Sequence, residues 1–458
     1  MVTTVGAFLT PFMGSSLTVA LPAIGRDFAM TAVLLGWIPT SYVLATAAVL
    51  VPFGKVGDIY GRKRIYVLGT LVVAVASLLS ALAPSAFWLL VFRVVAGVGS
   101  AMIFGTGLAI VTAVFPPGER GRAMGINVAA VYLGASLGPV LGGLLTERLG
   151  WRSVFLAAFV LGVVIVGLFL WKIRAEWVDA RRERFDYPGS AVYATALVAL
   201  MWGFSRLPGT SGAVLIAVGA GGLIVFGWWE ARARYPIVNM DLFRRNRVFA
   251  LSNAAGLINY SATFAVSFLL SLYLQYIKKY TAETAGLVLL VQPAMQAAVS
   301  PFAGRLSDRV EARVVASVGM GLTVAGLVVL ASLGDHTSIA LVVAALGVLG
   351  LGFGLFSSPN TNTIMSSVEP RFLGVAAATL STMRMTGQMF SMGIAMLVFA
   401  LAMGTVQITP AVYSSFLTSV RTAFGIFAVL CFAGIFASLA RGTLRQPGEA
   451  EVRGERTG

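Results

Sequence analysis

The sequence predicts an all-α protein that crosses a membrane many times. Of its 458 residues, 58% are hydrophobic and only 11% are charged, and the mean hydropathy is +0.88. Soluble domains carry about 25% charged residues. The apolar residues here gather in runs of about 17 to 25, the length that a helix needs to cross a bilayer. Composition and segment length together exclude a soluble globular fold.

Fourteen apolar segments are expected to span the membrane, and the first is a span rather than a cleaved signal peptide because it lacks a basic leader. They lie roughly at 3–24, 35–53, 65–83, 86–112, 123–145, 153–171, 187–206, 212–229, 248–273, 284–303, 314–332, 339–361, 374–400 and 419–440.

The basic residues predict the orientation of these spans. The net charge is +15 and the pI is about 10.4, which on its own would also suit a nucleic-acid-binding protein. Most of the 33 Lys and Arg, however, fall in alternate connections and in the tail after residue 440. Cytoplasmic loops of membrane proteins carry such an excess. We therefore expect both termini in the cytoplasm, the cytoplasmic membrane as the location, and no nucleic-acid partner.

A repeated motif divides the chain into two halves. Gly54 to Arg64 holds three Gly, one Asp and four cations between two apolar runs, and Gly304 to Arg309 repeats its opening 250 residues later. We expect both motifs to be cytoplasmic loops. The predicted units are a six-helix bundle at 1–171, a linker with two extra spans at 172–247, a second six-helix bundle at 248–440 and a cytoplasmic tail at 441–458. Such parallel halves place a transport site at their interface.

Residues for catalysis or for binding a metal are not evident. Cys431 is the single cysteine and falls within the last span, and the single histidine, His336, falls in a polar connection. A lone loop histidine is more often solvated than a metal ligand. The sequence therefore predicts no metal, no cofactor and no enzymatic activity.

The motif at Gly54 resembles the loop between the second and third helices of major facilitator superfamily transporters. That resemblance implies the major facilitator fold with a 6+2+6 arrangement of helices and two pseudo-symmetric halves. It also implies that the two motifs act as conformational latches. The latch residues are Gly54, Asp58, Gly61, Arg62, Lys63, Gly304, Asp308 and Arg309.

The fifth span carries a second resemblance, to the glycine-proline antiporter motif of exporters in the same superfamily. Gly134, Gly138 and Gly142 recur at every fourth residue, which makes a smooth helix face for close packing. Pro139 frees a carbonyl and permits a kink, and Gly143 completes the motif. Plain helix packing explains the same stripe, and both interpretations are kept.

Over nearly its whole length the chain resembles the fourteen-helix drug:proton antiporter family, but it departs from that family in the first predicted span. Segments such as Phe185 to Gly189 and Gly350 to Asn360 are similar to that family. The family usually has an Asp nine positions before the Pro of Ala20-Leu21-Pro22, and this chain has Met13 there, with Thr18 in place of Asn. All eighteen Asp and Glu fall at or beyond the predicted span ends. The acid that would exchange a proton is missing.

Two arginines are the charges that fall inside predicted spans. Arg93 and Arg384 favour an anionic, zwitterionic or neutral polar substrate over a dication, because ionisable residues within a membrane usually serve function. A structural role for Arg93, in which it snorkels or pairs with Asp27, is equally open. Polar stripes around Arg384, Gln292 and Asn253 point into a cavity or join helices. The candidates for substrate or coupling contacts are Ser15, Thr18, Asp27, Tyr42, Arg93, Asn127, Asn253, Tyr260, Gln292, Gln296, Arg384 and Gln388.

The function expected from these observations is export of small amphipathic molecules by alternating access, with proton antiport as the energy source. The alternative is a uniporter, or an exchanger of organic anions or lipid-like metabolites, that uses no protons. A receptor would need an appended signalling domain, and the tail from 441 is only eighteen residues long. The expected partners are a small-molecule substrate, membrane lipid and, for antiport, protons. The protein is expected to be a monomer.

Overall fold

The computed structural model describes residues 2–114, 120–172, 176–178, 185–233, 240–369, 373–404 and 406–442. Within these ranges the chain forms helices and short connections only. The first six helices are α1 (Val2–Asp27), α2 (Ala32–Tyr60), α3 (Arg62–Ala81), α4 (Ala86–Val114), α5 (Arg120–Leu149) and α6 (Arg152–Lys172).

Three helices follow in the linker region, and the second half is more broken than the first. The linker helices are α7 (Tyr187–Arg206), α8 (Thr210–Glu230) and the short α9 (Met240–Arg245). The second half contains α10 (Arg247–Thr263), α11 (Ala265–Leu272), η1 (Tyr273–Ile277), α12 (Ala282–Leu289), α13 (Val291–Arg309), α14 (Ala312–Ala331), α15 (Ile339–Ser366), α16 (Leu373–Met403), η3 (Pro410–Val412) and α17 (Tyr413–Ala440).

Thirteen helical stretches in the described part are long and apolar enough to cross a membrane, with α10 to η1 counted as one stretch and α12 to α13 as another. The predicted fourteenth span is α7, a helix of 20 residues. It carries Tyr, Ser, Thr and Arg along its length, which makes it less apolar than the other thirteen. It nevertheless packs alongside α8. With helices throughout the described residues, the predicted all-helical membrane fold is confirmed.

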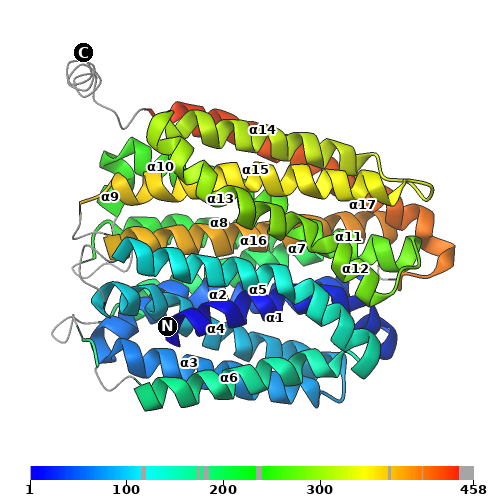
Figure 1. Ribbon diagram of the computed structural model, residues 1–458, viewed down its shortest axis with the longest axis horizontal. Helices are drawn as coiled ribbons and strands as arrows, with labels where there is room; N and C mark the ends of the chain where they lie inside the picture. The colour runs from blue at the N-terminus through cyan, green and yellow to red at the C-terminus, as the bar shows by residue number, and fades with distance from the viewer. Residues whose placement is uncertain are drawn as a thin grey trace.

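The two halves repeat one pattern of helix packing. In the first half α1 packs on α5, α2 and α3 pack on α4, and α3 packs on α6. In the second half α10 packs on α16, α13 and α14 pack on α15, and α14 packs on α17. Figure 1 shows the blue and cyan helices of the first half in the lower part of the molecule and the yellow to red helices of the second half above them.

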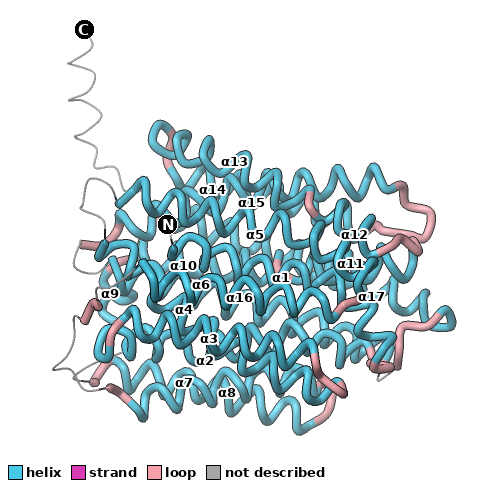
Figure 2. The backbone as a smooth tube through the Cα atoms, turned by 60° about the horizontal axis from the view of Figure 1, so that its bottom comes forward, coloured by secondary structure: helices cyan, strands magenta, loops and turns pink. Residues whose placement is uncertain are grey.

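The two extra helices lie at the edge of the bundle. α7 contacts α8, α2 and α16, so it touches one helix from each half. The Tyr193 hydroxyl donates to the Ala47 carbonyl of α2 at 3.2 Å, and the Phe204 ring packs edge-on against Phe390 of α16. α8 leaves large side chains such as Ile224 exposed, as a lipid-facing helix does. Figure 2 shows both helices at the periphery of the bundle.

The two motifs were predicted to be loops, and this prediction was wrong, because most of their residues are helical. α2 continues to Tyr60 and α3 begins at Arg62, so Gly61 alone separates them. Its φ of +116° is a conformation that side chains rarely adopt, which explains glycine at this point. The second motif likewise forms the last turns of α13, which ends at Arg309. Both helices continue past their apolar runs because their packing, α2 on α4 and α13 on α15, overrides the low helix propensity of the glycines in the motifs.

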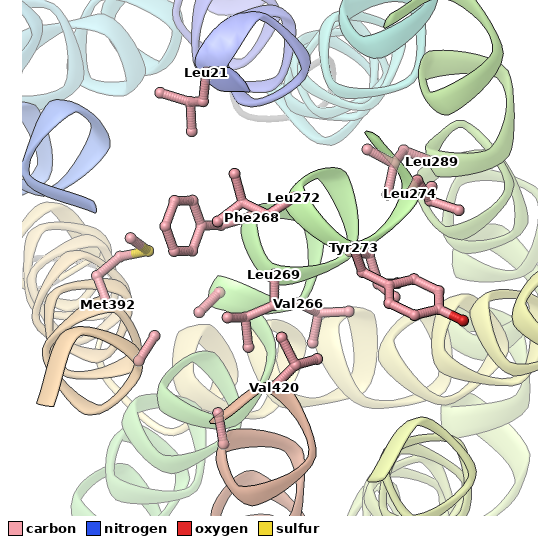
Figure 3. Close-up of a cluster of buried hydrophobic side chains, with 14 of the residues drawn as sticks. Leu21, Val266, Phe268, Leu269, Leu272, Tyr273, Leu274, Leu289, Met392 and Val420 are labelled. Carbon is pink, nitrogen blue, oxygen red and sulfur yellow. The ribbon is translucent and has the colours of Figure 1, made fainter. Parts of the chain in front are cut away.

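A hydrophobic core joins the halves at the end of the molecule where α1 finishes. It centres on α11, whose Phe268, Leu269 and Leu272 are buried. Figure 3 shows Leu21 of α1 and Met392 of α16 facing these side chains from different sides. The same core continues to α12 and α17. Burial of this apolar surface holds the two halves together here.

The second half also contains a buried arginine at the end of α17. Arg441 is 1% exposed and donates to Asn360 Oδ1 at 2.8 Å and to Ser252 Oγ at 3.3 Å. Burial, aided by the nearby charge of Arg313, lowers the pKa of Arg441 to about 10. Because a buried charge needs hydrogen-bond partners, this residue ties α17 to α10 and α15.

Candidate functional site

The Ala20-Leu21-Pro22 segment supplies hydrogen bonds between the halves. Pro22 has no N–H, so the carbonyl four residues earlier, that of Thr18, lacks its partner within the helix. Ser271 of α11 donates its hydroxyl to this carbonyl at 2.8 Å. One residue on, the Val19 carbonyl accepts from Gln275 Nε2 at 2.9 Å. The proline therefore creates a docking point for the other half. We call this end of the molecule, where α1 finishes and α2 begins, the closed end.

The predicted antiporter motif packs on two helices at once. A Cβ at Gly142 would lie 2.5 Å from Ser16 Cα of α1, and Ser16 Oγ donates to the Gly138 carbonyl at 2.8 Å. Gly143 faces the other half instead, where a Cβ would lie 3.0 Å from the Ala282 carbonyl carbon of α12. A Cβ at Gly286 would likewise lie 2.8 Å from the carbonyl carbon of Pro139. The two half-bundles therefore touch backbone to backbone at this motif.

Further contacts join the halves at the closed end. Glu147 of α5 accepts the Ala282 N–H at 3.1 Å, so a carboxylate of one half caps a helix of the other. The Ala32 N–H donates to the Val406 carbonyl at 3.1 Å, and Gln407 Nε2 donates to the Ala29 carbonyl at 3.0 Å. These bonds involve connections from both halves. The structure therefore describes a state in which this end is sealed.

Arg93 lies inside the first half and is 1% exposed. Its guanidinium lies 4.4 Å above the Tyr42 ring, its Nε donates to the Ile38 carbonyl at 3.4 Å, and its Nη1 contacts Met13 Sδ at 3.7 Å. Met13 is the position at which the resemblance implied an Asp. The Tyr42 hydroxyl in turn donates to Ser100 Oγ at 2.6 Å. A thioether thus lies beside this arginine at the position where the resemblance implied a carboxylate.

The proposed pairing of Arg93 with Asp27 is wrong. Asp27 accepts Arg152 Nη1 at 2.8 Å and Trp151 Nε1 at 3.0 Å at the exposed closed end. Arg93 does not snorkel either, because its head group is buried. Glu283 lies in the first turn of α12, two residues after the N-cap Thr281.

Arg384 lies between the halves. Its guanidinium is 5.5 Å from the Phe104 ring of α4, and it acts electrostatically on the hydroxyls of Tyr42 and Tyr260. Tyr260 packs edge-on against Phe353 at 5.3 Å. Arg384 is half-buried, yet its Nε is buried without a hydrogen-bond partner in the described part of the chain. The structure therefore brings Tyr42, Tyr260 and Arg384 together, from three of the predicted positions.

Other predicted contacts are placed elsewhere. Ser15 donates to the Pro11 carbonyl of its own helix at 2.8 Å, and the Thr18 hydroxyl donates to Gly14 at 3.0 Å. Asn253 is fully buried and donates to Phe249 of its own helix. The remaining candidates are Gln292, which is buried and whose Oε1 has no partner among the described residues, and Asn127, Gln296 and Gln388, which are half-exposed.

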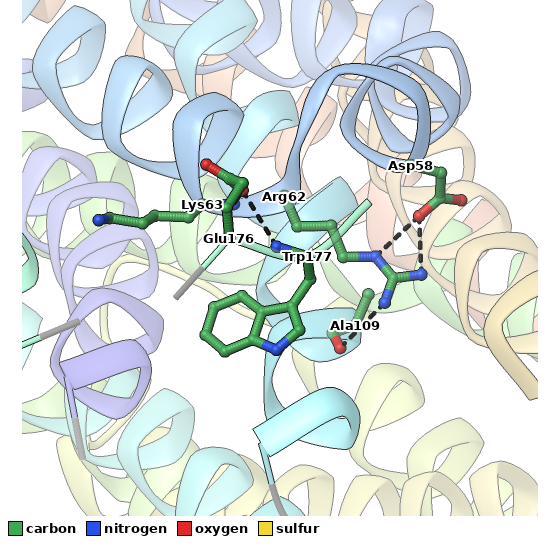
Figure 4. Close-up of polar contacts among 6 residues, drawn as sticks. All are labelled: Asp58, Arg62, Lys63, Ala109, Glu176 and Trp177. Carbon is green, nitrogen blue, oxygen red and sulfur yellow. Dashed lines mark hydrogen bonds and ion pairs between the residues drawn. The ribbon is translucent and has the colours of Figure 1, made fainter. Parts of the chain in front are cut away.

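The Gly54 motif binds the linker that joins the halves. Asp58 pairs with Arg62 at 2.8 Å, within the motif itself. Glu176 accepts the Lys63 N–H at 2.8 Å, and the Trp177 carbonyl accepts the Arg62 N–H at 3.0 Å. Figure 4 shows Glu176 at the start of α3 and Asp58 on the far side of Arg62. The linker carboxylate thus caps the positive end of α3.

The second motif lies at the end of α13, against α15. A Cβ at Gly304 would lie 3.1 Å from Ser358 Oγ, so this glycine allows α13 to approach α15. The side chain of Asp308 lies outside the described residues, as does the tail from 443. Arg309 closes α13. The latch role of both motifs stays a prediction.

Comparison with known proteins identifies the family. The model for the Major Facilitator Superfamily matches residues 3–392 and 253–457. The chain belongs to the major facilitator superfamily. It is 30% identical over 440 residues to the riboflavin transporter RibZ of Clostridioides difficile (strain 630), covering 95% of each chain. It is 33% identical to the multidrug resistance protein Stp of Mycobacterium tuberculosis (strain CDC 1551 / Oshkosh), covering 84% of this chain and 72% of that protein.

A solved structure shares the superfamily fold. The crystal structure of a bacterial homologue of the human lysosomal transporter Spinster, inward-facing and unoccupied, matches with a TM-score of 0.65. The match covers 97% of this chain and 98% of that one at 16% identity. The resemblance inferred from the motifs is therefore confirmed, and this major facilitator protein is a membrane-spanning transporter rather than an enzyme.

Several residues of the transporter were not predicted from sequence. Phe104 lies beside Arg384 but reads as an ordinary apolar residue of α4. Ser271 and Gln275 are polar residues four apart in an apolar segment, and that spacing was a usable signal. Glu176 lies in a basic linker, and only its position in space shows that it caps α3.

Proposed function

We propose that the protein is a secondary transporter that exports small amphipathic molecules across the cytoplasmic membrane by alternating access. The observation that carries this proposal is that one group of side chains is shared by the two halves. Tyr42 and Phe104 come from the first half, and Tyr260 and Arg384 come from the second. A ligand among them changes access when the halves move relative to each other.

The closed end supports the same mechanism. Its contacts are backbone approaches at glycines and a small number of hydrogen bonds, and such contacts separate without unfolding a helix. The relative named as a multidrug resistance protein supports amphipathic, drug-like compounds as the substrate class.

Opening of the closed end is tested by locking it. The Ala32 nitrogen lies 3.1 Å from the Val406 carbonyl oxygen across the halves, so the two backbones are in direct contact and these positions are chosen for a cysteine pair. The pair is introduced into a Cys431→Ala background, which removes the single native thiol. Efflux of an amphipathic dye from loaded proteoliposomes should stop on oxidation and return on reduction.

Each single-cysteine protein serves as the control and should transport equally with and without oxidant. If the oxidised pair, with its cross-link confirmed by mass, exports the dye at the rate of the reduced protein, alternating access through this end is wrong.

Two modes of transport fit this function, and we keep both as proposals. Proton antiport requires a carboxylate that titrates during the cycle, and the candidates are Asp27, Glu147 and Glu283 at the closed end. Uniport or exchange of organic anions or lipid-like metabolites requires none. The position of Met13 beside Arg93 is the specific observation that favours uniport or exchange. An imposed pH gradient separates them, because antiport rates follow the gradient and uniport rates of a permanently charged substrate do not.

A further inference from the structure

The two arginines within the membrane lack acidic partners among the described residues. Arg93 contacts a thioether, a carbonyl and an aromatic ring, and Arg384 lies beside the Phe104 ring and the Tyr260 hydroxyl. In the sequence as a whole, every Asp and Glu falls at or beyond the ends of the predicted spans. The interior therefore carries positive charge that no carboxylate in the described part neutralises. A charge in this position is unfavourable unless a counter-charge reaches it.

Arg384 is the more exposed of the two arginines. Arg93 is 1% exposed, whereas Arg384 is half-buried and lies between α4 of one half and α10 of the other. Its Nε is buried and has no hydrogen-bond partner in the described structure, so this donor stays unsatisfied until an anion enters the site. The planar guanidinium matches a carboxylate, sulfonate or phosphate group with two parallel hydrogen bonds.

Aromatic side chains lie near this guanidinium. Phe104 lies 5.5 Å from it, and Tyr260 stands edge-on to Phe353 on the side of the second half. Rings of this kind pack against the ring of a ligand in offset or edge-on geometry. Arg93 holds the Tyr42 ring in place at 4.4 Å, so it acts as a positioning residue. The site thus combines one half-buried guanidinium with nearby aromatic rings.

We propose that this site binds aromatic organic anions, that Arg384 holds their anionic group, and that the membrane potential drives their export. The proposal rests on the exporter function proposed above and names its substrate class and energy source. A monoanion that binds Arg384 pairs with the fixed charge, while a cation of the same shape is repelled. No bond is made or broken, and one negative charge leaves the cell in each cycle.

The potential is sufficient as an energy source. Moving one elementary charge through 100 mV is worth about 2.3 kcal/mol, which corresponds to about a fifty-fold concentration ratio. A cell interior that is negative expels anions. An exporter of anions therefore needs no proton-carrying acid, which agrees with methionine at position 13.

The binding test uses two probes with one ring system and opposite permanent charges, naphthalene-2-sulfonate and trimethyl(2-naphthyl)ammonium. Calorimetric titration of the purified full chain should show at least tenfold tighter binding of the sulfonate. Arg384→Gln should weaken sulfonate binding about ten- to hundred-fold, the usual worth of hydrogen bonds to a charged group. Arg384→Lys should retain part of the affinity. Arg206→Gln, at an exposed arginine of α7, is the matched control and should bind like the original protein.

The transport test imposes a potassium diffusion potential with valinomycin on proteoliposomes, with and without a pH gradient. Sulfonate flux should follow the potential, should be unchanged by the pH gradient and should fall in Arg384→Gln. Circular dichroism and size-exclusion profiles establish whether each variant is folded. If Arg384→Gln does not fold, the comparison is made with Arg384→Lys.

The outcomes separate this inference from the exporter function. Export of the ammonium probe but not of the sulfonate would leave the exporter proposal standing and overturn the anion site. Sulfonate flux that follows the pH gradient instead of the potential would overturn the energy source. If neither probe is exported, the exporter proposal fails, and the titrations alone decide the site. Equal binding of both probes would overturn the anion site. So would sulfonate binding that neither Arg384→Gln nor Arg384→Lys changes.

Discussion

Adding one methyl group at the closed end should shift the conformational equilibrium of the transporter. In Gly143→Ala the new Cβ would lie 3.0 Å from the carbonyl carbon of Ala282 in the other half, and closer still to its oxygen. Ordinary contacts are 3.4 Å or longer, and the neighbour is backbone, so α5 and α12 must move apart. Overpacking of this kind costs about 1 to 3 kcal/mol. The strain is present only while this end is sealed, so the population of the sealed state should fall about five- to 150-fold relative to the opened one.

The assay is a distance measurement between spin labels. Leu149 of α5 and Leu287 of α12 are exposed positions on either side of this contact, and cysteines there are labelled in a Cys431→Ala background. The original protein should show mainly the short distance, and Gly143→Ala should show a larger share of a longer one. Gly347→Ala is the control, because a Cβ there meets no described atom within 4 Å. Identical distance distributions for the two alanine variants would refute the argument.

Three further predictions concern other contacts of the described structure. Asp58→Asn should slow transport while ligand binding, measured by calorimetry, stays intact, and it should lower the free energy of unfolding by no more than about 1 kcal/mol because the ion pair is partly exposed; unchanged transport would contradict a latch role. Glu176→Gln should speed hydrogen exchange of the Lys63 amide, since an uncharged cap binds the start of α3 less strongly, and an unchanged exchange rate would show that the linker is held elsewhere. Asn360→Leu should lower the melting temperature, because it removes the 2.8 Å acceptor of buried Arg441 at an expected loss of about 1 to 3 kcal/mol; a melting temperature equal to that of the original protein would contradict this account.

The lengths and charges of the segments were readable from sequence because a bilayer imposes them. A helix must be long and apolar enough to cross, and basic residues stay on one side. The repeat of Gly54 in Gly304 showed two halves for the same reason, since each motif follows an even number of spans. Helix ends were not predictable in the same way. The motif at Asp58 is helical because the packing of α2 on α4 overrides the low helix propensity of its Gly and Asp residues.

Which face of a helix meets which neighbour was decided by tertiary structure. The spacing of Gly134, Gly138 and Gly142 predicted a packing face, but not that this face meets α1 while adjacent Gly143 meets α12 of the other half. Helical periodicity groups residues on one side of one helix and is silent about the helix opposite. The same reason explains why the Arg384 stripe could be predicted and its neighbour Phe104 could not.

The sequence by itself determined that this protein is a many-helix transporter of two similar halves, and that its first helix lacks the acid expected of its relatives. Only the tertiary structure decided what replaces that acid. Met13 packs against Arg93, Asp27 is bound by Arg152, and Arg384 lies between the halves among aromatic rings. The physical reason is that a sequence states which charges are present, whereas their effect depends on the distances between them, and folding alone sets those distances.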